Sequence, residues 1–212
     1  MNRKEISELI QHEKIVFITR LKDSSKIQAV IGRLASAGVR ILEVTSNTPK
    51  YTEAIIEARK SYPDILIGAG TVTNEKIANE AIKAGAQFLV TPNCNLTLID
   101  IAHKNNIPIL MGALTPTEVC EAFEAGADFV KLFPADIMGI AYFKSIKAPL
   151  DRVKILAVGN IKQNDVGLWM NAGATGIGIA SILKEPIKDE QDLIDIEQNA
   201  INFIKHIKKN HE

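Results

Sequence analysis

The sequence is poor in the residues that usually build metal centres and covalent cross-links. Its 212 residues include two cysteines and four histidines. Cys94 and Cys120 lack the spacing of metal ligands, so we expect reduced thiols, although Cys94 lies close to an expected strand end and could contribute to a site. The histidines fall outside the expected strand ends, and we expect surface positions for His12, His103, His206 and His211. A histidine-based metal site or catalytic triad is therefore not expected.

The chain also lacks an excess of charge and a long apolar run. Its 25 basic and 25 acidic residues give a formal net charge of zero, so no overall field attracts nucleic acid or an anionic membrane. No apolar run reaches the roughly 20 residues of a membrane span, and the charged start at residues 1–5 lacks the apolar core of a signal peptide. These features favour a small-molecule partner, with no nucleic acid and no membrane, and a cytoplasmic location.

What the chain does contain is a short repeated pattern. At four places an Ala-Gly pair ends a helical stretch and precedes a strand-like run, with the glycines at positions 38, 85, 126 and 173. Each glycine fits the left-handed conformation that commonly follows a helix C-terminus. The repeat predicts alternating strands and helices. The expected strands are 14–19, 40–45, 65–68, 87–91, 107–111, 128–131, 153–158 and 175–179.

Eight strands that alternate with helices favour an α/β fold with a closed parallel sheet. No linker or second domain is visible, so we expect a single-domain (β/α)8 TIM barrel over residues 1–212. An open doubly wound sheet is the alternative.

Several helices carry recognisable start signals. A helix at 24–37 is expected behind a Ser24 cap, and the segment 115–118, Thr-Pro-Thr-Glu, combines a capping box with proline at the first helical position. Further helices at 2–11 and 189–209 are expected to flank the barrel.

Lys131 stands inside the apolar run 128–134. Burial of an ammonium group costs free energy and lowers its pKa toward neutrality, which makes the amine nucleophilic. Lys131 is therefore a candidate for Schiff-base chemistry. The alternative is a strand-end lysine whose aliphatic stem packs while its charged end reaches water.

Glu43 occupies a similar position in the apolar segment 41–44. A parallel barrel takes its catalytic groups from the carboxyl ends of its strands, so Glu43 could exchange protons with Lys131. The alternative is a structural ion pair, in which the two buried charges satisfy each other without chemistry.

Polar residues gather at the other expected strand ends as well. These positions hold Arg20, Thr71, Pro92 within the turn 91–93, Thr115, Gly159, Asn160 and Ser181. We expect them to line the same barrel mouth as Lys131 and Glu43.

Five segments together resemble one family. Residues 42–45, 67–72, 91–93, 112–118 and 131–135 are similar, in order and at barrel spacing, to segments of the 2-keto-3-deoxy-6-phosphogluconate aldolases, also called 4-hydroxy-2-oxoglutarate aldolases. The resemblance covers nearly the whole chain, from residue 14 to 183. It implies a metal-independent class I aldolase with no cofactor, usually a homotrimer, that cleaves a 2-keto-4-hydroxy acid to pyruvate and an aldehyde.

The resemblance also implies roles for individual residues. Lys131 would form the Schiff base with pyruvate, and Glu43 would move protons. Arg20 matches an arginine that binds near the substrate carboxylate, while Thr71 and Pro92 would line the pyruvate end of the pocket.

Each binding role has a plain alternative. Phe133 would wall the pocket and help keep water from Lys131, or it could be a core residue. Arg20 could be a surface arginine, and the Thr71 and Pro92 segments could serve only their turns. Thr115 could serve only as a helix cap.

The distal end of the expected pocket departs from the family. There the family binds phosphate with backbone N–H groups of a Gly-Gly segment and a Gly-Ser pair. This chain has Val158 for a common threonine, Gly159-Asn160 for the Gly-Gly segment, and Ala180-Ser181 for the Gly-Ser pair. Side chains stand where bare backbone would approach an anion.

Three functions remain open from the sequence. The first is a Schiff-base aldolase acting on a 2-keto-3-deoxy sugar acid, 6-phosphogluconate-derived, or on 4-hydroxy-2-oxoglutarate, and the retention of both Lys131 and Glu43 favours it. The second is a phosphosugar isomerase on the same barrel. The third is a non-catalytic protein that binds a 2-keto acid.

Overall fold

Eight parallel strands close into a barrel in the order of the sequence, with β8 paired to β1. The computed structural model describes residues 1–183 and 185–209. The strands are β1 (Ile15–Thr19), β2 (Ile41–Thr45), β3 (Leu66–Gly70), β4 (Leu89–Val90), β5 (Ile109–Ala113), β6 (Phe129–Leu132), β7 (Ile155–Gly159) and β8 (Gly176–Ile179). The predicted (β/α)8 barrel is confirmed, and the open doubly wound sheet is excluded.

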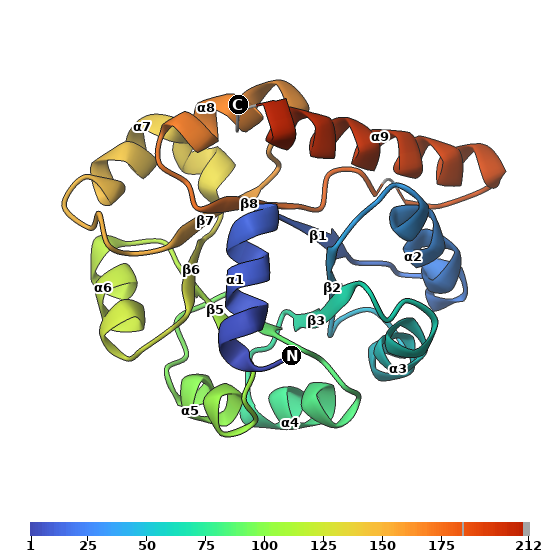
Figure 1. The fold of residues 1–212 in the computed structure, drawn as a ribbon, viewed down its shortest axis with the longest axis horizontal. Helices are drawn as coiled ribbons and strands as arrows, with labels where there is room; N and C mark the ends of the chain where they lie inside the picture. The colour runs from blue at the N-terminus through green and yellow to red at the C-terminus, as the bar shows by residue number, and fades with distance from the viewer. Residues whose placement is uncertain (184, 210–212) are drawn as a thin grey trace.

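Helical segments follow each strand and surround the barrel (Figure 1). They are η1 (Ser24–Lys26), α2 (Ile27–Ser36), α3 (Tyr51–Ser61), α4 (Glu75–Lys83), α5 (Thr97–Lys104), α6 (Pro116–Glu124), α7 (Ala135–Lys147), η2 (Gln163–Asp165), α8 (Val166–Asn171) and α9 (Glu190–Lys209), where η denotes a 3-10 turn. The four repeat glycines lie just past helix ends with φ of +85°, +94°, +94° and +95°, as the pattern predicted. Within the described ranges, no helix is long and apolar enough to cross a membrane.

Of the two predicted helix caps, one is confirmed and one is wrong. The capping box of α6 is present, with Thr115 and Glu118 bonded reciprocally. The predicted Ser24 cap is wrong, because Asp23 accepts the hydrogen bond from the Ser25 N–H at 2.9 Å and Ser24 lies inside η1. A carboxylate one residue earlier supplies the side-chain acceptor that a helix start needs.

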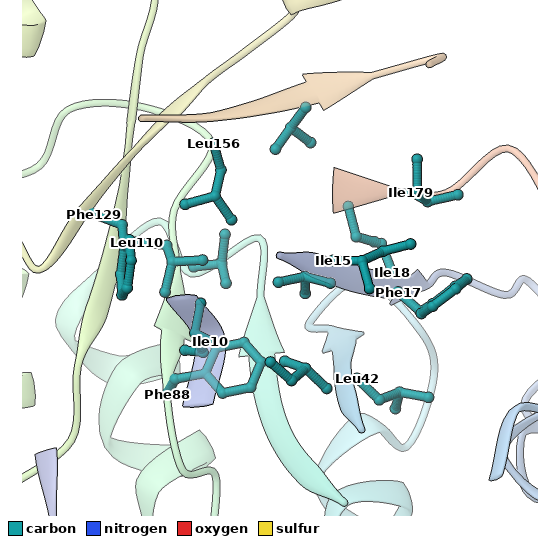
Figure 2. Close-up of a cluster of buried hydrophobic side chains, with 14 of the residues drawn as sticks. Ile10, Ile15, Phe17, Ile18, Leu42, Phe88, Leu110, Phe129, Leu156 and Ile179 are labelled. Carbon is teal, nitrogen blue, oxygen red and sulfur yellow. The ribbon is translucent and has the colours of Figure 1, made fainter. Parts of the chain in front are cut away.

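The helix α1 (Arg3–Glu13) lies across one opening of the barrel (Figure 1). Arg3 Nε donates to Asp128 at 2.7 Å, and Asp128 directly precedes β6, so this is the amino end of the strands. Ile10 of α1 is buried in one cluster with Phe88 and Leu110 (Figure 2). The amino end is therefore filled with apolar side chains, and the carboxyl end is left for polar groups.

Candidate active site

Lys131 and Glu43 are the buried ionisable side chains of the described part of the chain, 5% and 2% exposed. Glu43 lies in β2, in register with Ile18 of β1 and Gly68 of β3. Lys131 lies in β6, in register with Gly112 and Leu156. Both strands are apolar apart from these residues and, in β2, a threonine, because helices cover the outside of a parallel barrel and side chains fill its inside.

The Glu43 carboxyl is held in a dry environment. Burial raises its pKa above the ordinary value, and the positive charges of Lys131 and Arg20 oppose this rise. Its Oε1 atom is buried without a hydrogen-bond partner. Glu43 and Lys131 attract each other electrostatically, an interaction that both a structural pair and proton transfer would use.

The pKa of the Lys131 amine is shifted in the opposite direction. Burial lowers its pKa, the negative charge of Glu43 opposes this change, and the positive charge of Arg20 adds to it. Nζ lies 5.2 Å from the centre of the Phe133 ring, a cation–π contact. Phe133 is 37% exposed, so it is not a core residue.

Arg20 follows β1 and is exposed at the barrel mouth. Its charge acts on both Glu43 and Lys131, so the structure brings it to the same end of the barrel as the buried pair.

Thr71 directly follows β3 in a left-handed conformation with φ of +56°. Its carbonyl accepts a hydrogen bond from Ser46 Oγ at 2.8 Å, and the Ser46 N–H donates to the Gly70 carbonyl, also at 2.8 Å. Ser46 thus ties the end of β2 to the end of β3. Ser46 was not predicted from the sequence, where its only signal is its position three residues after Glu43.

The turn at Pro92 is fixed by its own neighbours. Thr91 Oγ1 donates to the Asn93 carbonyl at 2.7 Å and accepts from the Gly112 N–H at 2.7 Å. A Cβ added at Gly112 would meet the Pro92 carbonyl carbon at 2.5 Å, so the turn packs directly on β5 beside Lys131. These contacts explain the Pro92 segment as a turn, which is the alternative given for it. The turn also lies next to Lys131, because Gly112, on which Pro92 packs, is in register with Lys131.

Thr115 is explained by its helix. Its Oγ1 donates to Glu118 at 2.9 Å and accepts from the Glu118 N–H at 3.3 Å. Both interactions belong to the cap of α6, which is the alternative given for this residue.

The distal residues line two hollows beside the loop after β7. Asn160 and Ser181 share one of about 310 Å³, where Ser181 Oγ donates to the Ile161 carbonyl at 3.3 Å. Asn160 also lines a second, of about 470 Å³, together with Asp136 and Lys162. Asp136 and Lys162 were missed, although each lies just after a strand end.

Gly159 packs against one of those missed residues. A Cβ at Gly159 would meet Asp136 Oδ1 at 2.0 Å, so the bare backbone makes room for that carboxylate. Neither hollow beside the β7 loop includes Lys131 or Glu43 among its lining residues. A further cavity of about 520 Å³ lies against α1 and α9 and contains none of the predicted site residues. The two buried ionisable groups locate the candidate site better than cavity size does, because burial shifts the pKa of Glu43 up and that of Lys131 down.

The cysteines and histidines lie apart from these groups. Burial raises the pKa of the Cys94 thiol, which disfavours a reactive thiolate. His103 is half-buried and contacts Asp128 at 3.2 Å, so the predicted surface position is wrong for it. His206 Nδ1 lies 2.8 Å from the Asn202 carbonyl, and His211 falls outside the described residues. Over residues 1–183 and 185–209, no group of three or more His, Cys, Asp or Glu side chains is placed to hold a metal ion.

Comparisons with known proteins agree with one another. A family model described as KDPG and KHG aldolase matches residues 6–199. The 2-dehydro-3-deoxy-6-phosphogalactonate aldolase of Escherichia coli is 32% identical over 179 residues, which are 84% of this chain and 86% of the relative. The 2-dehydro-3-deoxy-phosphogluconate aldolase of Treponema pallidum is 32% identical over 78% of this chain and 79% of its own length. A solved structure described as "Native KDPGal structure" superposes with a TM-score of 0.86 at 29% identity, over 93% of this chain and 95% of the other.

Proposed function

We propose that this chain, which belongs to the KDPG and KHG aldolase family and is therefore a lyase, is a class I aldolase that uses Lys131 as its Schiff-base nucleophile. It would cleave a 2-keto-3-deoxy sugar acid to pyruvate and an aldehyde. The observation that carries the proposal is the burial of one amine and one carboxyl at the same end of the barrel, with the carboxyl oxygen unpaired.

Schiff-base formation needs a free amine and a proton donor. Burial lowers the pKa of Lys131, which increases the fraction of free amine near neutral pH. The amine attacks the C2 ketone to give a carbinolamine. Burial raises the pKa of Glu43, so its protonated form can donate to the departing hydroxyl, and water leaves.

Carbon–carbon cleavage needs a base. Glu43, now a carboxylate, accepts the C4 hydroxyl proton while the C3–C4 bond breaks. The electron pair of that bond passes to the protonated imine and forms an enamine, and the aldehyde departs. Glu43 then returns a proton to C3, and water hydrolyses the protonated imine to release pyruvate and the free amine of Lys131. The proton freed in this step passes to Glu43, which restores its protonated form.

Groups around the pair would bind the pyruvate half. Arg20 is the cation at the mouth, and we assign it to the substrate carboxylate. Phe133, whose ring centre lies 5.2 Å from Nζ, would limit the access of water to the amine. The Thr71 and Pro92 segments would form the remaining walls, whereas Thr115 is left to its helix cap.

The residues at the distal end of the pocket, Gly159, Asn160 and Ser181, would determine substrate specificity. Asn160 and Ser181 line the hollow where the tail of a longer sugar acid would extend, and Gly159 precedes them. The relatives named above act on phosphogalactonate- and phosphogluconate-derived acids, which differ in configuration at C4. We propose the 6-phosphogluconate-derived acid as substrate, with 4-hydroxy-2-oxoglutarate as the unphosphorylated possibility. A lactate dehydrogenase-coupled assay over both C4 epimers and over phosphorylated and unphosphorylated acids will rank them.

Borohydride trapping tests the mechanism. Hydride adds to the imine carbon and leaves a stable secondary amine, so pyruvate plus borohydride should inactivate the enzyme irreversibly. Mass spectrometry should place the adduct on Lys131, and Lys131→Ala should abolish both adduct and turnover. Lys154 is a matched control, because its Nζ lies 5.6 Å from the Phe129 ring centre but the residue is exposed. Lys154→Ala should retain the adduct.

Other outcomes would point elsewhere. An adduct on another lysine, or full turnover in Lys131→Ala, would remove the Schiff-base role. A Lys131 adduct without cleavage of any acid in the panel would favour the non-catalytic 2-keto-acid-binding protein. A phosphosugar isomerase needs no imine and would show turnover that pyruvate and borohydride leave unchanged.

Family resemblance adds two proposals, a homotrimeric assembly and a cytoplasmic location. The first is tested below through the mass in solution. The second is tested by fractionation of cells that express the chain at its native level.

A further inference from the structure

The carboxyl group of Glu43 occupies the space that a side chain at Gly70 would fill. A Cβ added at Gly70 would lie 1.6 Å from Glu43 Oε1, 2.2 Å from Cδ and 2.6 Å from Cγ. Real Cβ contacts are far longer, so any side chain at this position must displace the carboxyl group. Other barrel glycines differ, because the space at Gly68 is taken by the ring of Phe88 and that at Gly112 by the backbone of Pro92.

The backbone of Gly70 cannot easily retreat from Glu43. Its carbonyl accepts a hydrogen bond from the Ser46 N–H at 2.8 Å, and Thr71, the next residue, is bonded to Ser46 Oγ at 2.8 Å. Gly70 is also in register with Thr45 inside the closed sheet. The end of β3 is thus fixed on the side of β2, and the adjustable partner is the Glu43 side chain.

We infer that Gly70 is a positioning residue for Glu43: its bare backbone forms a seat on which the carboxyl group lies, buried and with Oε1 unpaired, facing the Lys131 end of the barrel. This inference rests on the proposed function of Glu43 as the proton carrier. A methyl group at Gly70 would push the carboxyl off the seat, whereas Lys131 lies in β6 with Gly112 and Leu156 as its neighbours in the sheet.

Gly70→Ala is therefore expected to lower kcat with little change in KM. A displacement of a catalytic group by about 1 Å costs on the order of 10²-fold in rate. The Lys131 adduct should still form with pyruvate and borohydride. Because the displaced carboxyl would be less buried, the limb of the pH–kcat profile that belongs to Glu43 should move to lower pH. Gly32→Ala, a methyl added in α2 next to the Tyr62 hydroxyl, controls for the addition itself and should leave activity unchanged.

A double-mutant cycle decides whether the effect passes through Glu43. In the Glu43→Gln background the carboxylate is already absent, so Gly70→Ala should lower kcat by less than about twofold. Equal losses in the two backgrounds would overturn the inference, as would a Gly70→Ala enzyme with wild-type kcat and pH profile.

Thermal unfolding gives a readout that does not depend on turnover. Gly70→Ala should lower the Tm, and Glu43→Ala, which removes Cγ, Cδ and Oε1, should restore most of that loss in the double variant. If Gly70→Ala lowers the Tm equally in the wild-type and Glu43→Ala backgrounds, the seat is also overturned. If instead the Lys131 adduct is missing in the wild-type protein, the proposed function fails while the Tm cycle still tests the seat.

Discussion

At the scale of single residues, burial and nearby charges set the protonation of Lys131 and Glu43. Burial lowers the pKa of Lys131 and raises that of Glu43, which moves both toward neutrality from opposite sides. Arg20 lowers the pKa of both groups, because its positive charge disfavours an ammonium and favours a carboxylate. Shifts in these directions favour proton exchange between the two groups, which the proposed carbinolamine formation and C–C cleavage would require.

Glu43→Gln should lose turnover while it keeps the fold. Removal of a general acid–base group costs on the order of 10²- to 10⁴-fold in kcat. Imine formation, followed by borohydride trapping, should slow as well, and circular dichroism should remain as in the wild-type protein. A loss of less than about threefold would assign the proton transfer to another group or to water.

The charges around Lys131 predict two pKa changes of opposite sign. Glu43→Gln removes a negative charge that stabilises the ammonium, so the pKa of Lys131 should fall further. Arg20→Gln removes a positive charge that destabilises it, so the pKa should rise. The rate at which an amine-reactive ester modifies Lys131, followed by mass spectrometry across pH, measures both. Midpoints that move together, or do not move, would contradict this electrostatic picture.

The burial of Lys131 and Glu43 could be predicted from the sequence because an ionisable residue inside an apolar run is conspicuous. The unpaired state of Glu43 Oε1 could not, because it depends on side-chain torsions and on the missing Cβ of Gly70. The role of Ser46 was hidden for a similar reason, since it acts through carbonyls of the neighbouring strand.

At the scale of elements, strands and helix ends followed local residue preferences, whereas one helix start did not. The repeat glycines located the helix ends because a left-handed backbone after a helix has a clear residue preference. All eight strands were predicted, and the predicted ends differ from the observed ends by no more than two residues. The differences arise because hydrogen-bonded pairing, and not apolar character, determines where a strand ends. The 3-10 turn η1 stands where the first turn of a helix was predicted. Asp23, and not Ser24, accepts the hydrogen bond from the Ser25 N–H at this helix start.

The capping box of α6 gives a prediction for Thr115. Thr115→Ala should lower the free energy of unfolding by about 1 kcal/mol, because the Glu118 N–H loses its acceptor. The KM for the substrate should stay within the error of the wild-type value. Thr117→Ala, an exposed change in the same first turn, is the control. A raised KM in Thr115→Ala would show that Thr115 contributes to substrate binding.

The loop after β7 gives a prediction for the distal end of the substrate. Asn160 carries a Cβ and an amide where a glycine would let bare backbone approach an anion. Asn160→Gly should lower KM for a phosphorylated acid and leave KM for an unphosphorylated one unchanged, because only distal binding improves. Initial rates on both substrates measure this. A higher KM for the phosphorylated acid would show that the Asn160 amide itself is a donor, and unchanged values would place Asn160 outside the contact.

At the scale of the whole molecule, one surface suggests how copies assemble. Ile137 is 77% exposed and Met138 38% exposed at the start of α7, beside the partly exposed Phe133. A neighbouring subunit would remove this apolar surface from water. Light scattering should give three times the chain mass, and Ile137→Asp should shift the population toward monomer. A monomeric wild-type protein would contradict the trimer.

The closure of the amino end by α1 has a consequence for the order of events in catalysis. Arg3 anchors this helix to Asp128, and Ile6 and Ile10 fill the opening, which leaves the carboxyl end for substrate and products. Under the proposed Schiff-base mechanism, the aldehyde is set free when the C3–C4 bond breaks, while pyruvate stays bonded to Lys131. The aldehyde would therefore leave through this shared passage before water reaches the imine and frees pyruvate. In kinetic terms the enzyme would be an ordered system with one substrate and two products. Pyruvate, as the last product out, would then be the one that competes with substrate for the free enzyme.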